Sequence, residues 1–198
     1  MKTTEFQQYL RNYQKREVIF DFDETISTLL INWAEWDRAV GQVLQRYDPA
    51  FVPIGIIEAV QQNTFMQRFG KKFRDDLLHM THKYEKELVS GHRVNSVALA
   101  LIEKARSAAN LHIWTSNHVE TIYPILQELH LNNAFKRIVA RSDVTFIKPH
   151  PEGFYRLFEE VNPKSTYLLI GDSKKDAEAA KSAGIDFLNI SSFCEDID

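Results

Sequence analysis

Cysteine is nearly absent from this chain, because Cys194 is the only one among its 198 residues. A single cysteine excludes an intramolecular disulfide framework, and it excludes a zinc site built from several thiolates. Such a composition is typical of a reducing compartment. We therefore predict a cytoplasmic protein.

An excess of positive charge and long apolar runs are missing as well. The formal net charge is -3, and the isoelectric point is near 6.2. This balance creates no overall field that attracts nucleic acid or an anionic membrane surface. No apolar run approaches the ~18 residues that a membrane span requires, and residues 1–16 are polar and charged. We expect neither a nucleic-acid nor a membrane partner, and any anion must be bound locally.

Short apolar runs predict buried strands. Each run is rich in β-forming residues and too short for a helix. The runs cover residues 18–20, 111–114, 137–140, 167–170 and 187–190. Apolar residues at three- and four-residue intervals predict helices between them, over residues 94–109, 119–129 and 173–183, the last of which ends before Gly184. Strands that alternate with helices predict an α/β fold with a parallel sheet.

The segment after the first strand has a different character. It has no strong strand run, and its aromatic residues recur at helical spacing: Trp33, Trp36, Phe65, Phe69 and Phe73. It is broken into an earlier and a later helical part by Pro49, Pro53 and Gly55. We predict a helical domain over residues 29–91 and a core made of residues 1–28 and 92–198.

Polar residues follow four of the predicted strands. In an open parallel sheet, ligands bind beyond the carboxyl ends of the strands, so these positions are candidates for a site. In chain order they are Asp21 and Asp23, then Thr115, Ser116 and Asn117, then Lys148, and finally Asp172, Ser173 and Asp176.

These residue types suit phosphoryl chemistry at a metal. Carboxylates on neighbouring loops repel one another unless a hard dication lies between them, and a few oxygen ligands suit Mg²⁺. Lys148 and a hydroxyl could neutralise and hydrogen-bond the oxygens of a phosphoryl group. Asp21 and Asp23 could divide the work between an ionised nucleophile and a proton donor. A free Asp titrates at about 3.9, so the donor requires a raised pKa.

With these residues in place, the chain resembles the haloacid dehalogenase superfamily. Residues 21–25 (DFDET) match its first motif, DxDxT, directly after an apolar strand. Thr115 or Ser116 matches the second motif, Lys148 in KPHPE the third, and residues 171–176 (GDSKKD) the fourth, in the family's order. The resemblance covers nearly the whole chain. It implies a Rossmann-like doubly wound parallel sheet with a small helical cap after the first motif, as in phosphoglycolate phosphatase-like members.

The resemblance also implies roles for these residues. Asp21 would be the nucleophile and a magnesium ligand, and Asp23 the general acid and base and a ligand through its carbonyl. Asp172 would be the third ligand, and Asp176 would support or join the metal shell. Thr115 and Lys148 would act in catalysis and would bind the substrate together with Ser116 and Asn117. The implied function is a magnesium-dependent phosphatase that hydrolyses a small phosphorylated metabolite through an aspartyl-phosphate.

Several alternatives stay open on the sequence alone. A phosphomutase or phosphotransferase of the same fold would pass the phosphoryl group to a sugar, and a silent module would only bind a metabolite or a protein. Thr115, directly after its strand, is favoured over Ser116 as the hydroxyl of the second motif. Asp176 could equally form a capping box with Ser173. The physiological substrate and the oligomeric state are not predicted.

Two features of the predicted cap and first motif complete these expectations. Glu24 stands where the family most often has glycine. Trp33 and Trp36 are expected to pack between the cap helices rather than to form a stacking platform.

Overall fold

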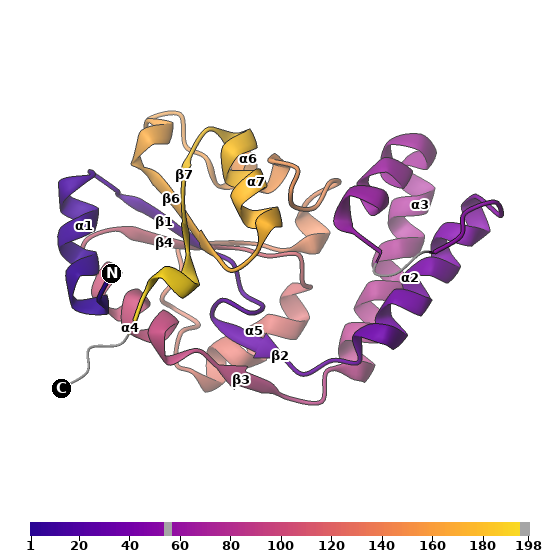
Figure 1. Ribbon diagram of the computed structural model, residues 1–198, viewed down its shortest axis with the longest axis horizontal. Helices are drawn as coiled ribbons and strands as arrows, with labels where there is room; N and C mark the ends of the chain where they lie inside the picture. The colour runs from indigo at the N-terminus through magenta and orange to yellow at the C-terminus, as the bar shows by residue number, and fades with distance from the viewer. Residues whose placement is uncertain (54–56, 195–198) are drawn as a thin grey trace.

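A five-stranded parallel sheet lies at the centre of the protein, whose structure is a computed structural model that describes residues 1–53 and 57–194 (Figure 1). Its spatial order is β5-β4-β1-β6-β7. The strands are β1 (Glu17–Phe20), β4 (Asn110–Trp114), β5 (Arg137–Val139), β6 (Tyr167–Gly171) and β7 (Asp186–Asn189). Each predicted apolar run matches one of these strands to within a residue, so the predicted α/β fold with a parallel sheet is confirmed. Gly55 and residues 195–198 lie outside the described residues.

The register of the central strand sets the position of the loops that follow it. Every residue of β1 is buried, and Phe20 pairs with Ile113 of β4 on one side and with Ile170 of β6 on the other. The three strands therefore end at nearly the same level. Their carboxyl-terminal loops are neighbours at one edge of the sheet.

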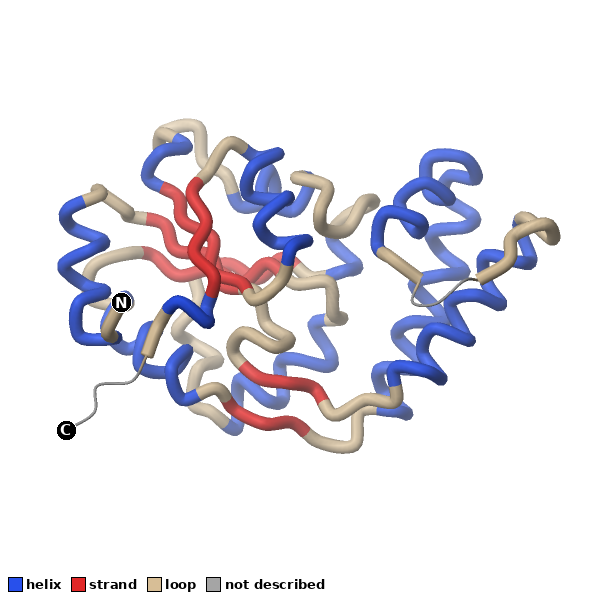
Figure 2. Tube along the Cα trace, in the orientation of Figure 1, coloured by secondary structure: helices blue, strands red, loops and turns tan. Residues whose placement is uncertain are grey.

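Helices cover both faces of the sheet (Figure 2). One face packs against α1 (Phe6–Asn12), α4 (Ser96–Ala105) and α5 (Val119–Glu128), and the other against α6 (Glu152–Leu157) and α7 (Lys174–Ala183). Alternate residues of β1 serve the two faces: Val18 and Phe20 lie in the first cluster and Ile19 in the second. Short 3₁₀ turns lie at Thr3–Glu5, Arg141–Asp143, Lys164–Thr166 and Ile190–Ser192.

Two of these helices were not predicted. Phe6 and Leu10 of α1 are fully buried against the sheet, although the N-terminal segment is polar and charged overall. Two apolar residues one turn apart are enough to dock a short helix here. Helix α6 follows directly on the segment that carries Lys148.

A helical unit stands apart from the sheet in Figure 1. It consists of α2 (Trp33–Tyr47) and α3 (Ala59–Leu88), which pack on each other around a hydrophobic cluster of their own. Gly70 has φ 66° and ψ −148°, outside helical values, and it kinks α3. A helical segment between the first strand and the rest of the sheet is thus present, as predicted. The domain boundaries at residues 29 and 91 remain predictions.

A two-stranded antiparallel ribbon joins this helical unit to the sheet layer. It pairs β2 (Ser27–Leu29) with β3 (His92–Val94), the segments through which the chain leaves and returns. The sequence does not predict this ribbon, because neither strand forms an apolar run.

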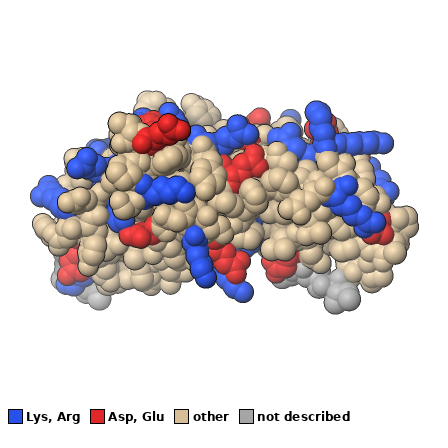
Figure 3. Space-filling view, turned by 90° about the horizontal axis from the view of Figure 1, so that it is seen from above, with Lys and Arg blue, Asp and Glu red and all other residues tan. Residues whose placement is uncertain are grey.

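Charges of both signs are interspersed on the face of the molecule seen in Figure 3. Within residues 1–53 and 57–194, the helices all fall short of the length and apolarity needed to cross a membrane.

Candidate active site

The polar residues that follow β1, β4 and β6 meet at one edge of the sheet. The backbone N–H of Asp21 donates to Ile170 O (2.9 Å), which continues the β1–β6 ladder into the loop. Thr115 N donates likewise to Val139 O (3.0 Å) on β5. These bonds hold the first residue of each loop as firmly as the strand that precedes it.

Lys148 lies at the centre of this edge. Its ammonium Nζ is 2.7 Å from Asp21 Oδ1 and 2.5 Å from Asp176 Oδ1, and it donates to Trp114 O (2.9 Å). Burial alone would lower the pKa of Lys148, but Asp176 and Asp21 raise it above its ordinary value. Lys148 is therefore a buried cation that is committed to two carboxylates.

The loop before Lys148 is held by a carboxylate and an amide. Glu152 accepts from the backbone N–H of Thr145 and of Phe146 at 3.0 and 2.9 Å. Asn63 of the helical unit donates to Ile147 O (2.8 Å) and accepts from Ile147 N (3.0 Å). Lys148 therefore reaches the site from a backbone that is fixed on both sides.

Three carboxylates cluster beside Lys148. Asp21, Asp172 and Asp176 each offer an oxygen, and these oxygens lie within 4.8 Å of one another. Burial, followed by the charge of Asp176, raises the pKa of Asp21 to about 7 and also raises the pKa of Asp172. One lysine does not neutralise three carboxylates, and hard oxygen donors at this spacing fit a dication such as Mg²⁺.

Asp176 has two structural partners as well. Its carboxylate accepts from Ser173 Oγ (2.5 Å) and Ser173 N (3.2 Å), which forms the capping box at the start of α7. Burial alone would raise the pKa of Asp176, but Lys148 lowers it below its ordinary value. The capping and metal-binding alternatives are therefore compatible in one side chain.

Gly171 makes this arrangement possible. A Cβ at this position would lie 2.6 Å from Asp176 Cγ, closer than side chains approach. The absence of a side chain at the end of β6 lets α7 bring Asp176 against the sheet.

Asp23 is kept apart from the carboxylate cluster. Its Oδ1 accepts from Leu29 N (2.8 Å) at the start of the chain's path into the helical unit. Burial raises the pKa of Asp23 to about 6, and the charges of Glu24 and Asp172 add to the effect. Asp21 and Asp23 are thus separated in sequence by a single residue but differ in their hydrogen-bond partners.

Glu24 adopts a backbone conformation that glycine adopts most easily. Its φ is 60°, in the left-handed region, and its side chain accepts from Thr28 Oγ1 (3.0 Å). This left-handed conformation explains why glycine suits the position. Glu24 adopts the same conformation, and its side chain forms a local hydrogen bond with Thr28.

The residues after β4 divide between the interior and the cavity. Thr115 is buried, donates to Asn117 Oδ1 (2.9 Å) and accepts from Asn117 N (3.1 Å). Ser116 and Asn117 line a cavity of about 380 Å³ together with Asp21, Asp23, Lys148 and Asp172. The structure therefore brings all the sequence-predicted site residues to one edge, with Thr115 just beneath its surface.

Several cavity residues were not predicted. Arg141 is buried and donates from Nε to Ser116 O (2.6 Å) and from Nη1 to Gln62 Oε1 (3.2 Å). Glu85 of α3 accepts from His118 N (2.9 Å) and Thr121 Oγ1 (2.7 Å), at the amino end of α5. Burial raises the pKa of Glu85 and lowers that of Arg141, and each charge partly offsets the effect on the other. These residues are far apart in sequence and carry no motif.

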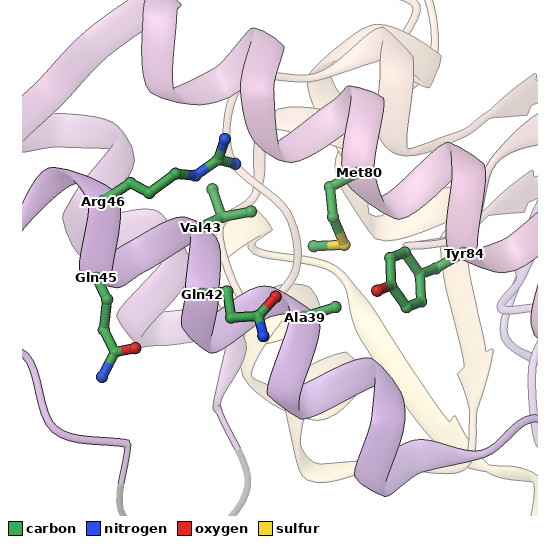
Figure 4. A pocket seen from close by; sticks show the side chains of 7 residues that line it. All are labelled: Ala39, Gln42, Val43, Gln45, Arg46, Met80 and Tyr84. Atoms are coloured by element: carbon green, nitrogen blue, oxygen red, sulfur yellow. The ribbon is translucent and has the colours of Figure 1, made fainter.

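A second hollow, of about 550 Å³, lies on the helical unit between α2 and α3 (Figure 4). Its lining is Ala39, Gln42, Val43, Gln45, Arg46, Met80 and Tyr84. It shares none of these residues with the first cavity and contains none of the predicted site residues. The candidate chemistry therefore belongs to the cavity at the sheet edge.

Known proteins share both the sequence pattern and the fold. A phosphoglycolate phosphatase from Yersinia pestis is 29% identical over 105 residues, which are 52% of this chain and 45% of that protein. The chain thus spans about half the length of the curated relatives that it matches. A solved structure described as a haloacid dehalogenase-like hydrolase, from Bacteroides fragilis, covers 87% of this chain and 86% of its own at 22% identity, with a TM-score of 0.60. Another, described as a predicted phosphoglycolate phosphatase from Haemophilus somnus, covers 89% and 85% at 21% identity, with a TM-score of 0.59.

The family model for haloacid dehalogenase-like hydrolases matches residues 18–190. Apart from Glu17 at the start of β1, this range includes the five strands of the sheet, the helical unit and each polar loop of the candidate site. The protein therefore belongs to the haloacid dehalogenase-like hydrolase family.

Proposed function

We propose that this protein is a magnesium-dependent phosphatase that hydrolyses a small phosphomonoester through an aspartyl-phosphate on Asp21. The observation that carries the proposal is the pairing of Lys148 with Asp21 at 2.7 Å, beside a cluster of three carboxylates. Lys148 would orient Asp21 and neutralise a phosphoryl oxygen. Family membership and the phosphoglycolate phosphatases among the relatives support this class of reaction.

In the proposed reaction, Asp21 attacks the phosphorus atom. A bond forms between its carboxylate oxygen and phosphorus, while the bond from phosphorus to the leaving alcohol breaks. Asp23 gives its proton to the alcohol oxygen and then takes a proton from the water that hydrolyses the aspartyl-phosphate. Burial raises the pKa of Asp23 to about 6, closer to neutral pH than that of an ordinary Asp, whereas Asp21, with a pKa of about 7 without metal, would be kept ionised by the ion that it helps to hold.

The remaining site residues bind and position the phosphoryl group in this proposal. Asp21, Asp172 and Asp176 would hold Mg²⁺, with Asp23 contributing its carbonyl, and the ion would supply positive charge to the phosphoryl oxygens. Thr115, the hydroxyl favoured from the sequence, would bind those oxygens from the β4 loop together with Ser116 and Asn117, and its hydrogen bonds with Asn117 hold the loop. The helical unit acts as a cap over the site. We also propose a cytoplasmic location, because the chain has a single cysteine.

Turnover of p-nitrophenyl phosphate tests the nucleophile and the metal together. We expect activity with Mg²⁺, loss of activity with EDTA, and a drop of about 10⁴-fold or more in Asp21→Asn. Asp75→Asn, an exposed carboxylate on α3, is the matched control and should keep full activity. Acid-quenched protein should carry a phosphate on the peptide that contains Asp21. Activity that survives in Asp21→Asn would contradict the proposal.

A further inference from the structure

Two tryptophans of the helical unit differ in how they are packed. Trp36 is 7% exposed, and it belongs to the hydrophobic cluster between α2 and α3, as predicted. Trp33 is 48% exposed and lies outside that cluster, although its ring meets Trp36 edge-on at 6.3 Å. Both residues line the cavity that contains Asp21. Packing therefore explains Trp36 but leaves a large face of Trp33 without an intramolecular role.

Apolar residues of the helical unit and of the segments that join it to the sheet line part of this cavity. Leu29, Ile31, Ile57 and Ala59 line it together with the two tryptophans. A concave wall of this kind, opposite a few polar groups, is how proteins bind the apolar part of a small ligand. The leaving alcohol of a phosphomonoester held at Asp21 would lie against this wall.

The charges of this wall disfavour an anionic alcohol. Among the described residues, the helical unit lines the cavity with two carboxylates, Asp37 and Glu85, and with no lysine or arginine. The cations in the cavity all come from the core. Lys148 is committed to Asp21 and Asp176, and the charge of Arg141 is offset by Glu85, which leaves exposed Lys175 on α7.

We propose that the substrate is a phosphomonoester whose alcohol carries a neutral aromatic ring, and that this ring stacks on Trp33. The inference rests on the proposed phosphatase function and narrows its substrate class. A glycolate group has no planar face to cover the indole, and its carboxylate would approach Asp37. A nucleoside or an aryl-methyl alcohol matches both the apolar face and the charge of the wall.

Steady-state kinetics with four kinds of phosphate ester test the substrate class. Nucleoside 5′-monophosphates and pyridoxal 5′-phosphate represent two sources of an aromatic ring, and phosphoglycolate and glycerol phosphate lack one. We expect at least one aromatic ester to have the highest kcat/KM. Phosphoglycolate as the best substrate would overturn the inference and leave the proposed phosphatase function intact.

Trp33→Ala tests the stacking directly. It should raise the KM of the preferred aromatic ester about tenfold to a hundredfold, with kcat and the KM of glycerol phosphate nearly unchanged. Trp33→Phe should restore most of the affinity, and Val60→Ala, an exposed apolar residue of α3 outside the cavity lining, is the control in the same unit. An equal rise in KM for all esters would assign Trp33 a structural role and overturn the inference.

A binding measurement separates this inference from the proposed reaction. Aromatic alcohols without phosphate should quench the tryptophan fluorescence of the wild-type protein, and this quenching should be lost in Trp33→Phe. Quenching without turnover of any ester would contradict the phosphatase and support the aromatic site. Turnover of an ester without such quenching would support the phosphatase and contradict the aromatic site.

Discussion

The sheet edge and the helical unit contribute to the same cavity in opposite ways. At the sheet edge, Lys148 lies between Asp21 and Asp176, and all three are buried. The helical unit reaches the core mainly through hydrogen bonds to backbone groups, such as Asn63 with Ile147, Arg74 with Ser142 O (2.7 Å) and Glu85 with His118 N (2.9 Å). Buried charges are costly to leave unpaired, whereas apolar walls and neutral hydrogen bonds tolerate change. The sheet edge should therefore be intolerant of substitution, and the helical unit should be where the substrate is selected.

Removal of the ammonium at the sheet edge should have the largest effect. Lys148→Met keeps an apolar stem but leaves Asp21 and Asp176 as neighbouring buried carboxylates without a cation. We expect a loss of about 3–5 kcal/mol in the free energy of unfolding without metal. We also expect a roughly 100- to 1000-fold loss of kcat with p-nitrophenyl phosphate. Urea unfolding and steady-state kinetics measure the two effects.

Lys174→Met is the matched control for this prediction. Lys174 lies on the neighbouring helix α7 with its side chain 89% exposed, and it pairs with Glu178 at the surface. Its replacement should change stability and kcat little. If Lys148→Met behaves like this control, the contrast between the sheet edge and the rest of the molecule is wrong.

A pair of glycine substitutions sharpens the same contrast. Gly171→Ala places a Cβ 2.6 Å from Asp176 Cγ, so Asp176 must move away from Lys148 and Ser173. We expect a loss of about 1–3 kcal/mol in stability and a clear loss of kcat. At Gly91, beside the ribbon that leads to the helical unit, a Cβ would meet Leu30 Cδ1 at an ordinary 3.7 Å. Gly91→Ala should be close to wild type in urea unfolding and in turnover, and equal effects of the two changes would contradict the argument.

The sheet edge was predictable because its information is local. Each buried strand is an apolar run, and candidate residues such as Asp21 and Asp172 follow such a run directly, although Lys148 comes only after a longer loop. Parallel strands end at one edge, so linear order is enough to bring these residues together. The separate environment of Asp23, by contrast, depends on its hydrogen bond with Leu29 N, which no pattern in the sequence indicates.

The helices of the helical unit could be predicted from the sequence, but their contacts could not. Aromatic spacing predicts its helices, yet Trp33 and Trp36 have the same residue type and differ in exposure only through the docking of α2. Glu85 of α3 meets His118 and Thr121 at the amino end of α5 and acts on Arg141 in the turn after β5, so residues far apart in sequence form this group. The ribbon of β2 and β3 is too short and too polar for a strand pattern, although it consists of the two segments that connect the helical unit to the sheet layer.

The junction between the two regions contains a histidine that should make stability depend on pH. His118 is buried at the start of α5, and its Nε2 is 2.8 Å from Thr81 Oγ1 of the helical unit. Burial, followed by the charges of Arg141 and His82, lowers the pKa of His118 to about 3. An unfolded histidine titrates at about 6.5, so below that pH the unfolded chain gains a proton that the folded protein does not bind. The contribution of His118 to stability is therefore complete above about pH 6.5 and decreases as the pH falls toward about 3.

Comparison of two variants isolates this effect from that of other titrating groups. His118→Gln keeps a hydrogen-bonding group without a titratable ring, so its stability difference between pH 7 and pH 5 should be smaller than the wild-type difference by about 2 kcal/mol. The raised pKa values of Asp21 and Asp23 act in both proteins and cancel in this comparison. His130→Asn, at an exposed left-handed position that asparagine tolerates, should retain the wild-type pH dependence. An unchanged pH dependence in His118→Gln would mean that His118 takes up a proton as readily in the folded protein as in the unfolded chain, which would contradict the effect of burial at this junction.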